Sequence, residues 1–409
     1  MKKEIKIPTL RFPAFSDLWQ QKLLEDIAIR GSGHTPDKSY PTYYNGGIKW
    51  ISLADSKRLD NGYIEETNIE ISTLGIKKSS AVLHPKESVL LSRDAGVGKS
   101  AVMKVEMAVS QHFIVWQAKE NQLNNWFLYY KLQILKPEFE RIATGNTIKT
   151  IGLPYFKKLK INIPLIAEQI KIANFLTTVD DKIIQLKKKK SLLEQFKKGV
   201  MQKLFSQSLR FKEEDGQDFP DWKEMQLQEV FYAVRGKGLS KDMVDCYGKN
   251  ECILYGELYT KYNEVVFTVH SRTNCENGVK SKIGDLLIPT STTTSGIDLA
   301  NATALNKNDV LLGGDITILR CNLEIVNVFY AYYLTNFKKQ EIANLAQGST
   351  IVHLYYSHIK DIKIDYPSIK EQTKIANFLS AIDDKMNHCS MQIEKMETWK
   401  KGLLQKMFC

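Results

Sequence analysis

The sequence predicts an α+β fold in which two mixed α/β bodies are separated by two long helices that form an antiparallel coiled coil. An internal duplication, heptad-spaced apolar residues and short strand-like runs predict this architecture. The duplication gives the fold a pseudo-two-fold symmetry. Along the 409 residues, the predicted order is a first body at 1–163, a helix at 164–206, a linker at 207–218, a second body at 219–366 and a helix at 367–409.

The duplication is visible as an ungapped match at a constant offset. Residues 145–182 align with residues 348–385 at an offset of 203, and by direct count 19 of these 38 positions are identical. Between about 26–143 and 229–346, little can be aligned. Each copy therefore combines a divergent body with a shared tail, and two such copies are typical of a pseudo-dimer built from one chain.

The first body contains strand-like runs at 48–53 and 89–92, with turn signals at Asn45-Gly46-Gly47 and Asn61-Gly62. A helical stretch follows at 126–135. Short runs between such turns are typical of a mixed, irregular sheet.

The first tail carries a narrow apolar stripe at steps of four and three residues, and no proline follows Pro164 within it. A stripe of this width over about 40 residues is typical of a coiled-coil seam. The seam candidates are Ile172, Leu176, Val179, Ile183, Leu186 and Leu193.

The second copy repeats this pattern. Strand-like runs occur at 285–289 and 310–312, and a helical stretch at 326–334. The seam candidates of its tail are Ile375, Leu379, Ile382, Met386 and Ile393. Lys197 and Lys400 occupy equivalent seam positions, where a charge sets the register or extends to solvent.

An alternative for the two tails is a pair of independent helices, each packed on its own body. The paired arrangement is favoured because the stripe exceeds the roughly 8–20 residues of a globular helix.

The formal net charge of +11 suits a polyanionic partner. Several stretches combine glycine with hydroxyl and cationic side chains, which is the chemistry of phosphate and base contacts. The candidate DNA-binding residues are Arg30, Ser32, Thr35, Arg93, Lys99, Thr147, Lys149, Arg235, Lys237, Thr290, Ser291, Thr292, Thr350 and His353.

Other classes of site find little support. Gly98-Lys99-Ser100 ends like a phosphate-binding loop, but Arg93 stands where that motif needs glycine. None of the six cysteines forms a C-x-x-C pair, and the histidines lack zinc-type spacing. No secretory signal or membrane span is predicted. We therefore expect a cytoplasmic protein without catalytic residues or a metal.

The chain resembles the specificity subunits of type I restriction–modification systems over essentially its whole length. The pattern Pro-x-x-x-Glu-Gln-x-Lys-Ile-Ala-x-Phe-Leu at 164–176 and 367–379 carries the resemblance. The segments at 180–183 and 197–205, together with the linker that begins at Leu209-Arg210-Phe211, are also similar to this family.

The resemblance implies that each body is a target recognition domain for half of a split site in double-stranded DNA. The tails would fix the gap between half-sites and dock two methyltransferase subunits, which translocase–nuclease subunits then join. S-adenosylmethionine would bind the methyltransferase subunits, and this chain would bind no cofactor.

Two other functions remain open from the sequence: a nuclease or methyltransferase with an unrecognised site, and a coiled-coil adaptor that binds protein only. Sequence-selective, salt-sensitive DNA binding in the complex would distinguish the favoured function from the adaptor. Methyl transfer by the chain alone would establish the enzyme.

Overall fold

The computed structural model describes residues 7–145 and 148–409, and the chain divides into two compact units. Unit 1 comprises Met1–Lys187 with Met391–Cys409, and unit 2 comprises Lys188–Ser390. The two long helices, α5 (Ile166–Phe205) and α12 (Ile369–Met407), contribute residues to both units. The predicted long helices are thus confirmed.

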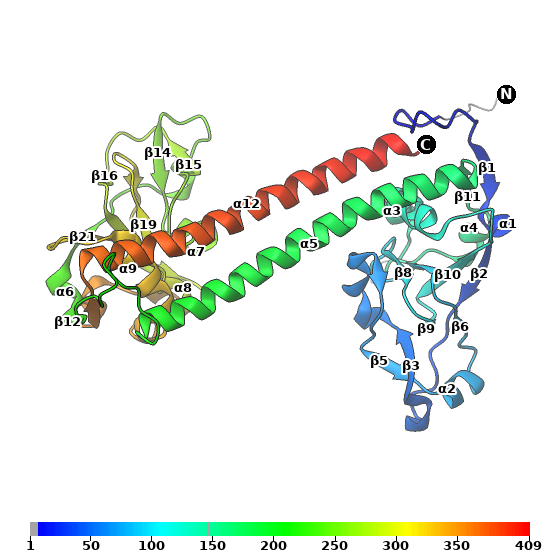
Figure 1. Cartoon of the computed structure of the whole chain (residues 1–409), viewed down its shortest axis with the longest axis horizontal. Helices are drawn as coiled ribbons and strands as arrows, with labels where there is room; N and C mark the ends of the chain where they lie inside the picture. The colour runs from blue at the N-terminus through cyan, green and yellow to red at the C-terminus, as the bar shows by residue number, and fades with distance from the viewer. Residues whose placement is uncertain (1–6, 146–147) are drawn as a thin grey trace. The chain divides into compact units, whose positions relative to one another are not determined.

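The body of unit 1 is built on a five-stranded sheet in the order β2-β10-β7-β8-β4 (Figure 1). Its strands are β2 (Ala28–Ser32), β10 (Phe113–Ala118), β7 (Val89–Ser92), β8 (Ser100–Met103) and β4 (Tyr63–Ile64). A four-stranded sheet of β5 (Ile69–Ile71), β3 (Tyr44–Ile51), β9 (Met107–Val109) and β6 (Leu83–His84) completes it. A separate antiparallel pair consists of β1 (Gln20–Leu23) and β11 (Lys160–Ile163).

Helix α3 (Asn125–Ile142) covers the five-stranded sheet of unit 1. It begins at Asn124, whose side chain accepts a hydrogen bond from the amide of Phe127, as expected of an N-cap. Apolar side chains of α3 and the fully buried β7 form one core. The shorter helices of this body are α1 (Leu24–Ile27), α2 (Thr73–Lys77) and α4 (Leu153–Lys157).

The body of unit 2 repeats the arrangement with a sheet in the order β13-β21-β17-β19. Its strands are β13 (Phe231–Arg235), β21 (Ile316–Cys321), β17 (Asp285–Pro289) and β19 (Thr303–Leu305). A second sheet comprises β15 (Ser271–Thr273), β14 (Asn250–Ile253), β20 (Leu311–Leu312) and β16 (Val279–Lys280). Two strand pairs are added by β12 (Lys223–Gln226) with β23 (Lys363–Tyr366), and by β18 (Ser291–Thr292) with β22 (Val352–His353).

The predicted helix at 326–334 is divided in the structure into α9 (Asn327–Tyr332) and a π-helical segment η5 (Tyr333–Phe337). The other helices of this body are α6 (Leu227–Val230), α7 (Glu257–Thr260), α8 (Gly296–Leu299), α10 (Lys339–Asn344) and α11 (Tyr356–Ile359). Buried aromatic side chains of α9 and η5 pack with α5 and α12 residues in the largest core of unit 2.

Strand register shows that the central sheets of the two bodies share one frame. Ser32 of β2 pairs with Ile114 of β10, and Arg235 of β13 pairs with Thr317 of β21, which is the same pair displaced by 203 positions. The frame extends to the neighbouring strand, because Ile114 pairs with Leu91 of β7 and Thr317 pairs with Ile288 of β17. The divergent bodies can therefore be compared position by position.

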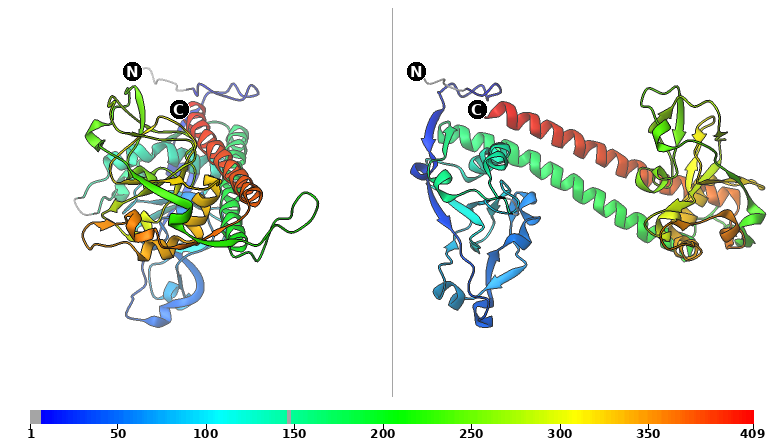
Figure 2. Two further views of the ribbon diagram at one scale, coloured as in Figure 1. Left: turned by 90° about the vertical axis from the view of Figure 1, so that its left-hand side faces the viewer. Right: turned by 180° about the vertical axis from the view of Figure 1, so that it is seen from behind.

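Within each unit, α5 and α12 lie side by side and run antiparallel (Figures 1 and 2). In unit 1, Lys187 contacts Glu397 at 2.6 Å and Asp180 contacts Lys400 at 2.5 Å, so the residue numbers rise along one helix as they fall along the other. Eight seam candidates are buried: Ile172, Leu176, Val179, Ile183, Leu186, Ile375, Leu379 and Ile382. Three are half-buried: Leu193, Met386 and Ile393.

No helix in the described ranges combines the length and the apolar character that crossing a membrane requires.

Candidate functional site

A cluster of polar side chains lies at the end of the central sheet in the first body. The carboxylate of Asp94, just after β7, accepts a hydrogen bond from the Thr150 hydroxyl and lies 2.8 Å from Nδ1 of His112. Nε of Arg93 is 3.6 Å from the same carboxylate. This Nε atom is buried and has no hydrogen-bond partner among the described residues. The cluster thus retains an unused donor.

The second body carries a cluster at the equivalent position. The hydroxyl of Ser291 lies 3.1 Å from Nδ1 of His353. Nη2 of Arg235 donates to Oδ1 of Asp315 at 3.2 Å, and its guanidinium lies 5.9 Å from the centre of the Tyr355 ring. This cluster exposes a cation, because 68% of the Arg235 side chain is accessible to solvent.

Backbone hydrogen bonds confirm that the two clusters correspond. The amide of Arg93 donates to the carbonyl of His112 at 3.0 Å, and that of Thr290 donates to the carbonyl of Asp315 at 2.8 Å. His112 and Asp315 are therefore counterparts, as are Arg93 and Thr290. The side-chain chemistry at these counterpart positions differs between the two bodies.

Each cluster adjoins a tight loop that the duplication preserves. Thr144 pairs with Thr150 and Gln347 pairs with His353 at the base of the two loops. At Gly348, φ is +118°, and a Cβ atom there would lie 2.1 Å from the carbonyl oxygen of Ile351. Gly145 in the first loop has φ +127° and an equally close neighbour, so both loops require glycine.

Each loop exposes one of the predicted DNA-binding residues to solvent. Lys149 is exposed in the first loop and Thr350 in the second. Thr147 lies outside the described residues. In the second body, the structure brings Arg235, Ser291 and His353 together, and it leaves Lys237 exposed nearby in sequence.

The remaining candidates of the first body form no shared cluster with Arg93. Arg30 forms an ion pair with Glu25, and Lys99 forms one with Asp60 at 2.8 Å. Thr35 donates to the Gln111 side chain at 2.5 Å, and Ser32 is exposed at the end of β2.

The structure corrects the expectation of direct DNA contact at Thr290, Ser291 and Thr292. All three side chains are buried, and Ser291 and Thr292 belong to β18, which pairs antiparallel with β22. Thr292 shares a hydrogen bond of 2.8 Å with Thr294, and Ser291 supports His353. Ser291 and Thr292 therefore support neighbouring polar side chains and contribute little to the exposed surface.

A cavity of about 230 Å³ adjoins the cluster in the second body. The hydroxyl of Thr290 is buried there and has no hydrogen-bond partner among the described residues. The residues that line the cavity are Ala233, Val234, Arg235, Thr290, Thr317, Tyr355, Tyr356 and Ser357. An unpaired buried hydroxyl beside an exposed guanidinium provides polar groups for a ligand.

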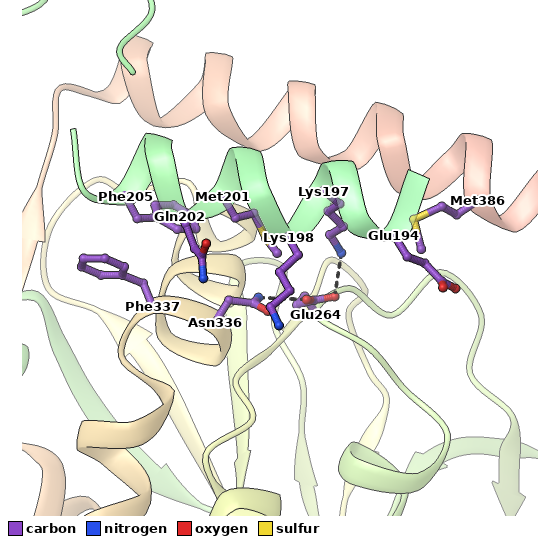
Figure 3. Close-up of a pocket in the computed structure, with 10 residues that line it drawn as sticks. All are labelled: Glu194, Lys197, Lys198, Met201, Gln202, Phe205, Glu264, Asn336, Phe337 and Met386. Carbon is purple, nitrogen blue, oxygen red and sulfur yellow. Dashed lines mark hydrogen bonds and ion pairs between the residues drawn. The ribbon is translucent and has the colours of Figure 1, made fainter. Parts of the chain in front are cut away.

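A second polar feature of unit 2 lies between α5 and the body (Figure 3). Nζ of Lys197 is 2.8 Å from Oδ1 of Asp383 and 3.2 Å from Oε2 of Glu264. Burial raises the pKa of Asp383 and outweighs the attraction of the Lys197 ammonium. For Glu264 burial acts in the same direction, but Lys197 and the Asn336 amide together lower its pKa below the usual range. Lys197 is therefore a buried cation shared by two carboxylates.

Each long helix is anchored to its body by a Glu-Gln pair near its start. The guanidinium of Arg11 binds Glu168 through two hydrogen bonds of 2.7 and 2.6 Å, and Arg210 binds Glu371 through bonds of 3.1 and 2.8 Å. Sequence reasoning missed both arginines. The repeated tripeptide, Leu10-Arg11-Phe12 and Leu209-Arg210-Phe211, was the signal that could have found them.

The glutamines complete this anchor. Gln169 accepts from the amide of Asn124 at 2.9 Å and donates to the carbonyl of Pro164 at 2.9 Å. Gln372 makes the same two bonds with Val326 and Pro367, also at 2.9 Å. The segment that both copies share thus contains the residues that attach each long helix to its body.

Comparison with known proteins places the sequence in one family. The model of the type I restriction modification DNA specificity domain matches residues 16–195 and 220–395. The putative type I restriction enzyme MjaX specificity subunit of Methanocaldococcus jannaschii is 24% identical over 407 residues, which cover 94% of this chain and 92% of that protein. The MjaVIII specificity subunit of the same organism is 22% identical and covers 80% of each chain.

Solved structures share the fold. The crystal structure of a type I restriction–modification S subunit from M. genitalium aligns with a TM-score of 0.64 at 17% identity, covering 99% of both chains. A chain from a structure on complex assembly and conformational transition of the type I system aligns with a TM-score of 0.54 at 14% identity. It covers 95% of this chain and 97% of that chain.

Proposed function

Because the chain belongs to the type I restriction–modification DNA specificity family, we propose that each of its two bodies reads one half of a bipartite site in double-stranded DNA. It is a specificity subunit with two tandem specificity domains, and such subunits are non-catalytic. The observation that carries the proposal is the pair of polar clusters on one shared frame. Equivalent positions with different side chains are what two readers of different base sequences need.

The loops beside the clusters supply the second kind of contact. Glycine allows backbone amides to approach a phosphate, and Lys149 adds a neutralising charge. Contacts of this kind position the protein on the duplex without reading bases. The loops would thus contact phosphates and the clusters would read bases. This assignment fits the loop sequence, which the two copies share, and the clusters, which differ between them.

We further propose that α5 and α12 set the spacer between the half-sites. At 1.5 Å per residue, the 40 residues of α5 span about 60 Å. Two-fold readers bind half-sites whose centres are about one helical turn, or 34 Å, apart. Helices that contribute to both units are the elements of this chain that can hold such a distance.

Two equivalent aromatic patches support docking of two copies of one partner. We define patch 1 as Phe12, Phe175 and Trp399, whose neighbouring ring centres are 5.7 and 6.0 Å apart. Trp399 is 48% exposed. Exposed aromatic side chains of this size are common at protein interfaces.

Patch 2 comprises Phe211, Phe378 and Phe196, with ring centres 5.5 and 6.4 Å apart. Phe196 is 54% exposed and is the counterpart of Trp399 at the offset of 203. We propose that each patch receives one methyltransferase subunit. Translocase–nuclease subunits join that core, and S-adenosylmethionine binds the methyltransferase subunits.

The test is a footprint of DNA bound to the complex of this chain with its methyltransferase subunits. Wild-type protein is expected to protect two short segments separated by a fixed gap. Lys149→Ala is expected to weaken protection over one segment only, and Thr350→Ala over the other. Equal loss over both segments in each variant would contradict separate readers.

The same complex distinguishes the alternatives. Binding that ignores DNA sequence would leave the adaptor function. Methyl transfer by this chain without its partners would make it an enzyme.

A further inference from the structure

We propose that Arg235 reads a guanine in the half-site of the second body, with Asp315 and Tyr355 as its positioning residues. The proposal rests on the proposed function and goes beyond it, because it names one reading residue, the base that it selects and the half-site to which that base belongs.

Arg235 is exposed but held in one place. It is the last residue of β13, where pairing with Thr317 fixes its backbone. Asp315 accepts from Nη2 on one side, and the Tyr355 ring lies beneath the guanidinium. Nη2 carries a second hydrogen, so it can still form a two-donor fork with Nη1 or with Nε for an external acceptor, since Asp315 is the acceptor that the described residues supply to this group. A guanidinium that is already oriented loses less conformational freedom on binding.

Asp315 itself is held in an uncommon backbone conformation. Its φ is +59°, in the left-handed region, which aspartate adopts more readily than most residues other than glycine. Its carbonyl accepts from the amide of Thr290 at 2.8 Å, and the preceding Gly314 amide donates to the Gly238 carbonyl at 2.7 Å. These two hydrogen bonds fix the backbone on both sides of the Asp315 side chain.

The chemistry of the cluster selects guanine among the bases. Guanine presents two acceptors, O6 and N7, in the major groove, and the arginine fork matches both. The Asp315 carboxylate, which would suit the amino group of cytosine, is already bound to Arg235. The unpaired hydroxyl of Thr290 lines the adjoining cavity and provides a polar group behind the fork.

The first body lacks this arrangement. Ser32 stands at the counterpart of Arg235, and His112 stands at the counterpart of Asp315. His112 contacts the carboxylate of Asp94, which also accepts a hydrogen bond from the Thr150 hydroxyl. The guanine requirement set by this position therefore belongs to one half-site.

The experiment measures base preference of the methyltransferase complex at every position of the recognised site, for Arg235→Ala and Arg235→Gln. Both variants are expected to lose discrimination for guanine at one position by roughly 5- to 150-fold. The affected position lies in the half whose protection depends on Thr350. Lys237→Ala is the matched control, because Lys237 is exposed two residues away. It is expected to weaken binding to all sequences alike and to reduce the salt dependence by about one counterion.

Asp315→Asn provides a second test that leaves the arginine in place. It should reduce the discrimination for guanine at the same position by a smaller factor. Thermal unfolding of each variant verifies that the chain still folds. Unchanged guanine discrimination in Arg235→Ala and Asp315→Asn, or a wild-type half-site without guanine, would overturn the proposal while a bipartite site still supports the proposed function. A wild-type complex that recognises no bipartite site would refute the proposed function itself.

Discussion

Lys197 and Asp383 form a buried ion pair between α5 and α12, and Lys400 and Asp180 form its counterpart at the offset of 203. A tyrosine completes each contact. Tyr332 donates its hydroxyl to Asp383 and lies 4.8 Å below the Lys197 ammonium. In unit 1, the hydroxyl of Tyr130 donates to Asp180 at 2.8 Å, and the Tyr130 ring lies 5.6 Å from the ammonium of Lys400. The seam lysines are thus register-setting cations and do not extend freely into solvent.

Replacing Lys197 with methionine is expected to destabilise the chain by about 3 kcal/mol, because it leaves the buried carboxylates of Asp383 and Glu264 without their cation. Lys400→Met is the matched control. Its ammonium and the Asp180 carboxylate are each 21% exposed, so water compensates part of the loss. Urea unfolding measures the loss of unfolding free energy in both variants. Equal losses would contradict the expectation that the Lys197 ion pair contributes more than the Lys400 ion pair.

A charge within the seam should separate the helices. Val179 is 4% exposed and Ile382 is 5% exposed, so Val179→Asp or Ile382→Asp buries a carboxylate without a partner. We expect a loss of roughly 3 kcal/mol or more and failure to assemble with the methyltransferase subunits. Ile184→Asp is the control, since that side chain is 50% exposed, and it should change the stability by less than about 0.5 kcal/mol. Normal assembly by both seam variants would refute helix pairing.

Insertion of one heptad into each long helix should lengthen the recognised spacer. One insertion follows Lys187 in α5 and the other follows Ser390 in α12, so each unit keeps its own ion pairs. Seven residues add about 10.5 Å of helix, which corresponds to roughly three base pairs. Sequencing of methylated DNA from cells that express the variant measures the spacer. An unchanged spacer would contradict the proposal that α5 and α12 set the distance between the half-sites.

The two aromatic patches predict how many methyltransferase subunits bind to the chain. Trp399→Ala or Phe196→Ala removes the exposed ring of one patch and should yield complexes with one methyltransferase subunit in place of two. The double variant should bind neither subunit tightly. Native mass spectrometry counts the subunits directly, and complexes with two subunits in all three variants would exclude these patches as the docking sites.

The first body should lose stability in weak acid through His84. Burial lowers the pKa of this histidine, although the carbonyl of Ser32, 3.3 Å from Nε2, partly offsets the effect. The unfolded chain then binds more protons than the folded chain once the pH falls below the unfolded pKa of about 6.5. The stabilisation is complete above that pH and is lost as the pH falls through the lower folded-state pKa. His84→Gln should flatten the dependence of the unfolding free energy on pH between about 7 and 5. An unchanged slope would exclude this group.

Local patterns predicted the elements that depend on local sequence. The runs at 89–92 and 285–289 coincide with β7 and β17, because continuous apolar residues between turn signals suffice to define a buried strand. The tails were predicted as helices because their heptad spacing persists over many turns. In contrast, the run at 310–312 forms only the short β20.

Contacts between distant residues were not predictable from these patterns. The polar sequence of Thr290 to Thr292 predicts an exposed loop, but these side chains are buried, and Ser291 and Thr292 pair with β22, some 60 positions away. The Arg235–Asp315 pair joins residues 80 positions apart. Neither residue lies within the well-aligned repeat, so the offset gave no indication of the contact.

The anchors at the start of α5 and α12 have an evolutionary and practical consequence. Glu168 and Gln169 bind an arginine and a backbone amide of the first body, and Glu371 and Gln372 make the same bonds with the second. The amino-acid sequences of the two bodies nevertheless differ. The joint is therefore indifferent to the sequence that a body reads. A body exchanged for a foreign one, with its arginine and the receiving amide retained, can inherit the helix and its partners unchanged. We expect such an exchange to change the specificity without any redesign of the assembly.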